Sequence, residues 1–177
     1  MKKLFIILIV NLALNANAQC RLENPHPFAI EDVSAICNAI GMQYINVYES
    51  NIYMPCNQYR NNATSTNDMY GNPIIVYDPK WFEGIYLNLG RAANISILAH
   101  EIGHHAQNHS SIRGMFLNQW QKELEADFLS GYAMAKMGYS LYDSLIAIRN
   151  LSRGCSYSHP CTNNRIQAIT NGWYYAN

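Results

Sequence analysis

Two histidines spaced four residues apart constrain this chain more than any other feature. On a helix, His100 and His104 share one face, so their imidazoles can converge on a single metal ion. Glu101 lies beside them, where a carboxylate can take a proton from a metal-bound water. The run around them predicts a buried helix, because aliphatic residues clothe its other faces: Ile95, Ile97, Leu98 and Ile102. The alternative is a core helix whose histidines bond backbone carbonyls.

A tetrahedral zinc site needs further ligands, and a catalytic one takes a third from the protein and keeps one position for water. The metzincin pattern places a third histidine ten residues after the first, with a glycine three before it. This chain has Ser110 and Gln107 there, so that pattern is excluded. His105 points about 100° away from His104 on a helix. His109 lies beyond the expected helix end, and we interpret it as a surface residue.

A carboxylate from a second helix remains as the third ligand. Glu123 and Asp127 are four residues apart and share a face, whereas Glu125 points nearly opposite. We therefore assign Glu123 to the metal and Asp127 to the ring N–H of a liganding histidine. Glu125 is expected on a solvated helix face.

The first eighteen residues read as a signal peptide. Lys2 and Lys3 precede an apolar run, and Ala16-Asn17-Ala18 offers a cleavage site. Residues 19–177 then form a single domain, in which residues 19–60 are a supporting part or a pro-segment. We expect an exported protein, periplasmic or secreted, with no stable membrane insertion. The formal charge is zero and removal of the two lysines makes it slightly negative, which argues against nucleic-acid partners.

Five cysteines follow the cleavage site, and an oxidising compartment predicts disulfides. Cys155 and Cys161 close a short loop and form the first expected bridge. Cys37 with Cys56 is a second pairing, which would leave Cys20 free.

Periodicity and turn residues predict an α+β chain with a mostly helical C-terminal half. The expected helices are 28–42, 80–87, 91–108, 119–137, one that begins at Ser140 or Asp143 and ends at Ile148, and 163–174. The expected strands are 43–49, 51–54 and 73–77, and residues 57–72 are expected to form a loop, residues 110–114 a turn. A peptide could add to the strand Ile74–Tyr77 if that strand edges the sheet, and an internal strand is the alternative.

Three ordered blocks resemble a known group of enzymes. Leu98–His105, with its H-E-x-x-H motif, and Glu123–Gly131, with E-x-x-x-D, resemble the gluzincin metallopeptidases of the CAAX prenyl protease, HtpX and minigluzincin kind. Ser158-His159-Pro160 with Arg165-Ile166 resembles the group's S-H-P…R-I segment. The His105 and Gln107 pairing is similar to neutral zinc metallopeptidases of the YpfJ type. Many relatives carry transmembrane helices, whereas this chain has only the signal peptide.

The resemblance implies a zincin-like fold, with a small sheet packed on the active-site helix, and a zinc peptidase acting on peptide or protein substrates. Zn²⁺ on His100, His104 and Glu123 would activate water, with Glu101 as general base and acid. His159 would donate to the developing oxyanion, or its segment would only set the turn before the last helix. Arg165 is expected as an ion-pair partner.

A second function class is compatible with the same ligands. A catalytically silent binding protein could keep zinc as a structural element, with a cysteine such as Cys20 or Cys56 in the water position. A latent enzyme would combine both, with the N-terminal part of the mature chain covering the cleft.

Overall fold

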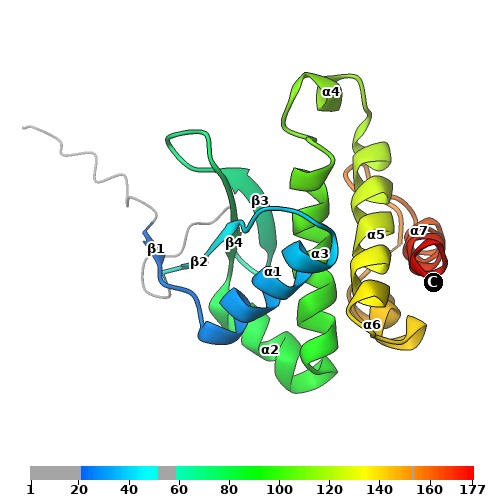
Figure 1. Ribbon diagram of the computed structural model, residues 1–177, viewed down its shortest axis with the longest axis horizontal. Helices are drawn as coiled ribbons and strands as arrows, with labels where there is room; N and C mark the ends of the chain where they lie inside the picture. Colours follow the sequence, from blue (N-terminus) through cyan, green and yellow to red (C-terminus); the bar gives the residue numbers. More distant parts are fainter. Residues whose placement is uncertain (1–20, 52–58, 153) are drawn as a thin grey trace, which may run out of the picture.

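The computed structural model describes residues 21–51, 59–152 and 154–177, and the predicted signal peptide, Cys20 and Cys56 lie outside them. The described chain is α+β, as predicted: the sheet belongs to the N-terminal half and the C-terminal half is mostly helical (Figure 1). The strands are β1 (Leu22–Glu23), β2 (Asn46–Ser50), β3 (Ala63–Asn67) and β4 (Pro73–Tyr77). The helices are α1 (Pro27–Ala39), α2 (Pro79–Leu89), α3 (Arg91–Ala106), α4 (Ile112–Met115), α5 (Gln119–Lys136), α6 (Leu141–Leu151) and α7 (Thr162–Ala176).

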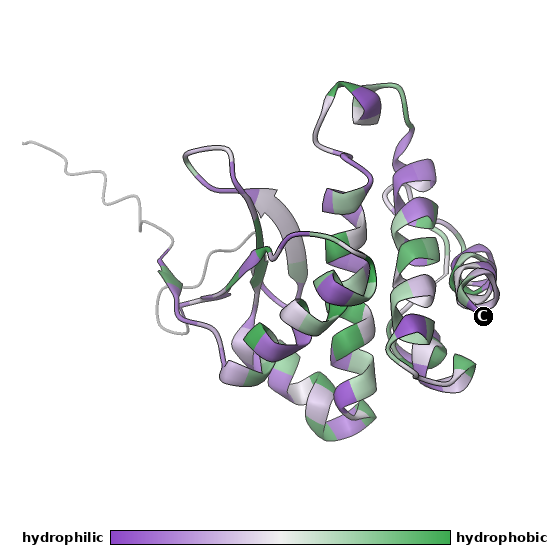
Figure 2. Ribbon diagram, in the orientation of Figure 1, coloured by the Kyte–Doolittle hydropathy of each residue, from purple (hydrophilic) through white to green (hydrophobic). Residues whose placement is uncertain are grey.

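Helix α3 is the centre of the molecule. The sheet, α1 and α2 lie on one side of it and α5, α6 and α7 on the other (Figure 1). Its buried aliphatic residues join those of α1, β2, β4 and α5 in the main core, with Val33, Ile36, Ile45, Ile75, Ile95, Leu98, Ile102 and Met134 at its heart. The prediction of a buried helix around the two histidines is therefore confirmed. Figure 2 shows the contrast between the hydrophobic stretches of α3 and the pale purple of β3.

The sheet has the order β1-β2-β4-β3. β2 pairs with β4 in parallel, whereas β1 with β2 and β3 with β4 are antiparallel pairs. Residues 74–77 of β4 are all buried, because this strand is flanked on both sides. The internal alternative for Ile74–Tyr77 is thus the correct one, and β3 is an outer strand of the described sheet.

Strand β3 contradicts the predicted loop over residues 57–72. Its sequence Ala-Thr-Ser-Thr-Asn has no apolar alternation, so the period-2 signal is missing. Pairing with the apolar β4 supplies its hydrogen bonds, with Thr64 opposite Val76 and Thr66 opposite Ile74. Of the predicted strand 51–54, Asn51 follows β2 and the rest lies outside the described residues.

Side-chain caps set the helix starts close to the predicted ones. Asp78 accepts hydrogen bonds from the backbone N–H groups of Lys80 and Trp81 at the start of α2. Ser140 and Asp143 form a capping box at α6, and Asn118 and Gln121 form another at α5. Between α3 and α5, the short helix α4 occupies most of the predicted turn at 110–114 and continues one residue beyond it.

A disulfide joins Cys155 to Cys161, as the short loop predicts. Cys37 is buried in the main core as a free thiol, so the pairing of Cys37 with Cys56 is wrong. None of the helices in the described ranges is long and apolar enough to cross a membrane.

Candidate metal centre

His100, His104 and Glu123 form one group that could hold a metal ion. One ligand atom from each residue lies within 4.8 Å of the other two. The Nε2 atoms of the histidines are 3.2 Å apart, and Glu123 places its Oε2 3.3 Å from His100 Nε2 and its Oε1 3.6 Å from His104 Nε2. Three donors from two helices therefore face one point.

Two antiparallel helices bring these groups together. One turn of α3 separates the histidines, and α5 runs beside α3 (Figure 1). Glu123 of α5 places its carboxylate within reach of both rings. The side chain of Glu123 is 6% exposed, and those of His100 and His104 are 14% and 15% exposed. The group is therefore largely buried, with the two rings slightly more accessible than the carboxylate.

Burial and neighbouring charges shift the pKa values of all three residues. Burial alone would lower the pKa of His100, but the carboxylates of Asp127 and Glu123 outweigh it and raise that pKa to about 10. Burial would raise the pKa of Glu123, yet the contact and charge of His100 lower it to about 2. Burial and the charge of His100 lower the pKa of His104 to about 3. Glu123 is therefore ionised and His104 neutral at neutral pH, which are the forms that ligate metals.

One atom of the group has unused bonding capacity. Oε1 of Glu123 accepts a hydrogen bond of 3.0 Å from Gln119, but the buried Oε2 makes none within the described part of the chain. A buried carboxylate oxygen without a partner is costly unless a cation satisfies it. Two imidazoles and one carboxylate are the donor set of many catalytic zinc sites. The donor set fits a divalent metal ion, and Oε2 of Glu123, which lies 3.3 Å from Nε2 of His100 and makes no other close contact as an acceptor among the described residues, is placed to ligate it.

Asp127 lies behind His100, with Oδ1 2.9 Å from the imidazole Nδ1, although the ring N–H does not point along this line. Arg165 of α7 donates two hydrogen bonds to the same carboxylate, at 2.7 Å and 2.8 Å. Burial would raise the pKa of Asp127, but the charges of His100 and Arg165 keep it below its usual value. Arg165 is thus in an ion pair, as the sequence predicted, and its partner is Asp127.

Glu101 is held by the outer strand. Its Oε2 accepts a hydrogen bond of 2.7 Å from the backbone N–H of Ser65 in β3. Burial raises the pKa of Glu101 above its ordinary value. Glu101, His100 and Asp127 line one cavity of about 700 Å³, whose other walls include Asn62, Trp81, Ile97, Ser152 and Cys155.

His159 lies at the mouth of this cavity with half of its side chain exposed. Its Nε2 is 3.7 Å from Oε2 of Glu123, and its Nδ1 is 2.9 Å from Oγ of Ser158. The same segment also forms the turn before α7, since Ser156 N–H donates to the His159 carbonyl. Both predicted alternatives for His159 therefore have a structural counterpart.

No protein-family model matches this chain, and no curated protein or solved structure matches it significantly.

Two residues near the centre were misjudged from the sequence. His109 is buried, and its Nδ1 is 2.8 Å from Nδ1 of His104. Glu125 accepts from His109 and from Arg113 instead of facing only solvent. Asn108 was the missed signal, because asparagine tolerates the left-handed conformation (φ 54°) that turns the chain back at a helix end.

Proposed function

We propose that this protein is a zinc-dependent endopeptidase. The observation that carries the proposal is the carboxylate of Glu101, which lines one cavity with His100 of the three-donor group. In the described residues that group contains no fourth protein ligand. One coordination position is then open to water or substrate, which is the arrangement of a catalytic rather than a structural zinc site.

His100, His104 and Glu123 would hold the ion. The chemistry that zinc supplies when bound is Lewis-acid activation of a water and of the scissile carbonyl. Glu101 takes the proton of the attacking water and delivers it to the leaving amine. Its raised pKa suits both steps, because a general base that later acts as an acid works best with a pKa near the working pH.

The outer edge of β3 would bind the substrate backbone. The N–H of Ser65 points away from β4 and towards Glu101. Backbone groups alternate along a strand, so those of Ala63 and Asn67 also point away from β4. An extended peptide could pair there as an added strand, with affinity from main-chain hydrogen bonds. This edge contacts α3, which brings a bound peptide towards Glu101.

His159 would act from the opposite wall. With Nδ1 engaged by Ser158, its Nε2 faces the metal group and can donate to the charge that develops on the carbonyl oxygen. The exposure of its side chain leaves it accessible to a substrate.

The test is hydrolysis of denatured casein by purified protein loaded with one equivalent of zinc. We expect cleavage that a chelator abolishes and added zinc restores. Parallel samples with reductant distinguish a latent enzyme from one that is active as purified. A latent enzyme would be activated by reduction or by trimming of its N-terminal part. A protein that binds zinc tightly and never cleaves casein would be the silent metal-binding alternative.

A further inference from the structure

His109 returns to the metal centre because α3 ends in a Schellman motif. Asn108 adopts the left-handed conformation, its N–H donates to the His105 carbonyl, and the N–H of His109 donates to the His104 carbonyl at 3.0 Å. This fold-back puts the His109 ring at a centroid distance of 5.0 Å from the His104 ring. The contact is thus fixed by the backbone.

The hydrogen bonds beyond His104 form a directed chain. Nδ1 of His104 is 2.8 Å from Nδ1 of His109, and Nε2 of His109 is 2.9 Å from Oε2 of Glu125. An ionised carboxylate only accepts, so Nε2 of His109 carries the hydrogen. In the neutral imidazole, Nδ1 of His109 is then an acceptor. His104 must therefore donate from Nδ1, which leaves its Nε2 lone pair free towards Glu123 and His100.

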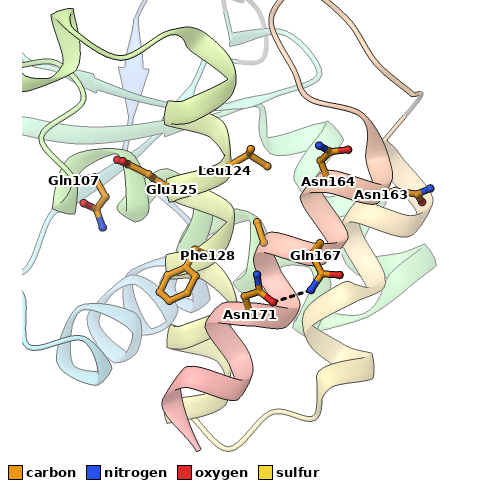
Figure 3. A pocket seen from close by; sticks show the side chains of 9 residues that line it. Gln107, Leu124, Glu125, Phe128, Asn163, Asn164, Gln167 and Asn171 are labelled. Carbon is orange, nitrogen blue, oxygen red and sulfur yellow. Dashed lines mark hydrogen bonds between the residues drawn. The ribbon is translucent and has the colours of Figure 1, made fainter.

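Arg113 anchors the far end of the chain. Its Nη2 donates to Oε1 of Glu125 at 2.8 Å, and its Nη1 donates to the carbonyl of Gln107 at the end of α3, also at 2.8 Å. Figure 3 shows Glu125 pointing from α5 towards Gln107. The Glu125 carboxylate thus lies between two nitrogen donors, the Arg113 guanidinium on one oxygen and the His109 ring on the other.

The connection between α3 and α5 is shaped around this chain of bonds. A Cβ atom at Gly114 would lie 1.9 Å from the carbonyl oxygen of His109, so only glycine permits this approach. Ser111 caps the short helix α4 by accepting from the N–H of Arg113. Both details hold Arg113 and His109 where the chain of bonds needs them.

We propose that His109 and Glu125 are positioning residues that orient the His104 ring and hold it in the tautomer that binds a divalent metal ion. Neither residue contacts the ion. The inference rests on the proposed metal centre and deepens it, since it adds a second support beside the Asp127 contact to His100. Outer partners of this kind typically contribute about 10- to 100-fold in metal affinity.

The test is the zinc dissociation constant, measured by competition with a chromophoric chelator. We expect His109→Leu to raise it about 10- to 100-fold. His109→Gln, whose amide oxygen can accept from His104, should recover part of the loss. His105→Leu is the matched control, because His105 is a partly buried histidine at the end of α3 that bonds the Ile74 carbonyl instead. It should leave the constant unchanged.

A second variant tests the proposal even if substitutions of His109 prevent folding. Glu125→Gln replaces a partly exposed side chain, and we expect it to weaken zinc binding and to alter the visible absorption bands of the cobalt-substituted protein. Wild-type protein that binds no divalent ion would overturn the metal centre and with it the positioning role. Tight binding by wild type with equal constants for His109→Leu and Glu125→Gln would overturn the positioning role alone.

Discussion

Gly103 of α3 and Ala126 of α5 are in backbone contact: a Cβ atom at Gly103 would lie 2.9 Å from Cα of Ala126 and 3.0 Å from its carbonyl oxygen. Gly103 comes just before His104, and Ala126 lies within one turn of Glu123. The separation of the two helices at this contact therefore sets the distance between the imidazole and the carboxylate. Gly103, one of the two residues that the H-E-x-x-H pattern leaves unspecified, is therefore the one that lets α3 and α5 approach closely at the metal centre.

Substitution of Gly103 by alanine should weaken both the fold and the metal centre. The added methyl group meets backbone that cannot rotate away, so α5 must move, at a cost of about 1–3 kcal/mol in the free energy of unfolding. Zinc affinity should fall as well, because Glu123 moves with α5. Chemical denaturation of the metal-free protein and chelator competition measure the two effects.

Gly84→Ala is the matched control for that substitution. Gly84 lies within α2, and a Cβ atom there would meet nothing within 4 Å. Alanine should stabilise this helix by roughly 0.5–1 kcal/mol and leave zinc binding unchanged. A Gly103→Ala protein as stable and as zinc-avid as wild type would show that the contact does not set the helix separation.

Glu101→Gln should separate metal binding from hydrolysis. The amide retains the shape of the side chain and can still accept from Ser65, so zinc content should stay at the wild-type level. Proton transfer is lost, and kcat should fall at least about 10²-fold. Metal analysis together with a casein assay decides the matter, and a zinc-loaded Gln variant with full activity would exclude Glu101 as the base.

Ser65 acts on Glu101 through its backbone N–H and through its hydroxyl, and two variants separate these contacts. Ser65→Pro removes both the N–H and the hydroxyl, whereas Ser65→Ala keeps the N–H and removes only the hydroxyl. Loss of a hydrogen bond to a charged group is worth about 1.5–3 kcal/mol, so kcat/KM should fall about tenfold or more in the proline variant. An outer strand tolerates the missing donor. Equal activities in the two variants would show that the backbone N–H of Ser65 in β3 does not contribute to catalysis.

His159 should affect turnover more than stability. If Nε2 donates to the developing charge, His159→Ala should lower kcat about 10²-fold or more, with little change in zinc content. Its half-exposed side chain predicts an unchanged midpoint of thermal unfolding. An alanine variant with wild-type kcat would assign the Ser158-His159-Pro160 segment to the turn alone.

Metal binding should release a proton. Opposing carboxylates raise the pKa of His100 to about 10 in the metal-free protein, so this imidazole is charged at neutral pH, and it must become neutral to ligate. Zinc affinity should then rise about tenfold per pH unit from 6.5 to 8.5. Calorimetry in buffers of different ionisation enthalpy should report one proton released per ion, and an enthalpy independent of buffer would contradict this.

The raised pKa of His100 also makes the free energy of unfolding of the metal-free protein depend on pH. Because the folded-state pKa of His100 lies above its unfolded value, the stabilisation is fully present below about pH 6.5 and is lost as the pH rises through about 10. His100→Gln should remove this part of the pH dependence of unfolding.

Local patterns predicted the helices well because capping and periodicity act within a few residues. Asp78 caps α2 one residue before its first turn, and Ser140, one of the two starts that the sequence allowed, caps α6. The four-residue spacing of Glu123 and Asp127 correctly turned both to one face, where they meet His100. Strand β3 had no such signal, since its order comes from pairing with β4 and not from its own composition.

The sequence by itself determined which side chains share a face: two imidazoles on α3 and two carboxylates on α5, set by the 3.6-residue turn of a helix. Only the tertiary structure decided which other residues contact the side chains of the site. The fold-back at Asn108 brought His109 onto His104, and the pairing of β3 with β4 placed Ser65 against Glu101. The physical reason is that helix geometry is local, whereas these contacts depend on how separate elements pack, here on the close approach that Gly103 allows.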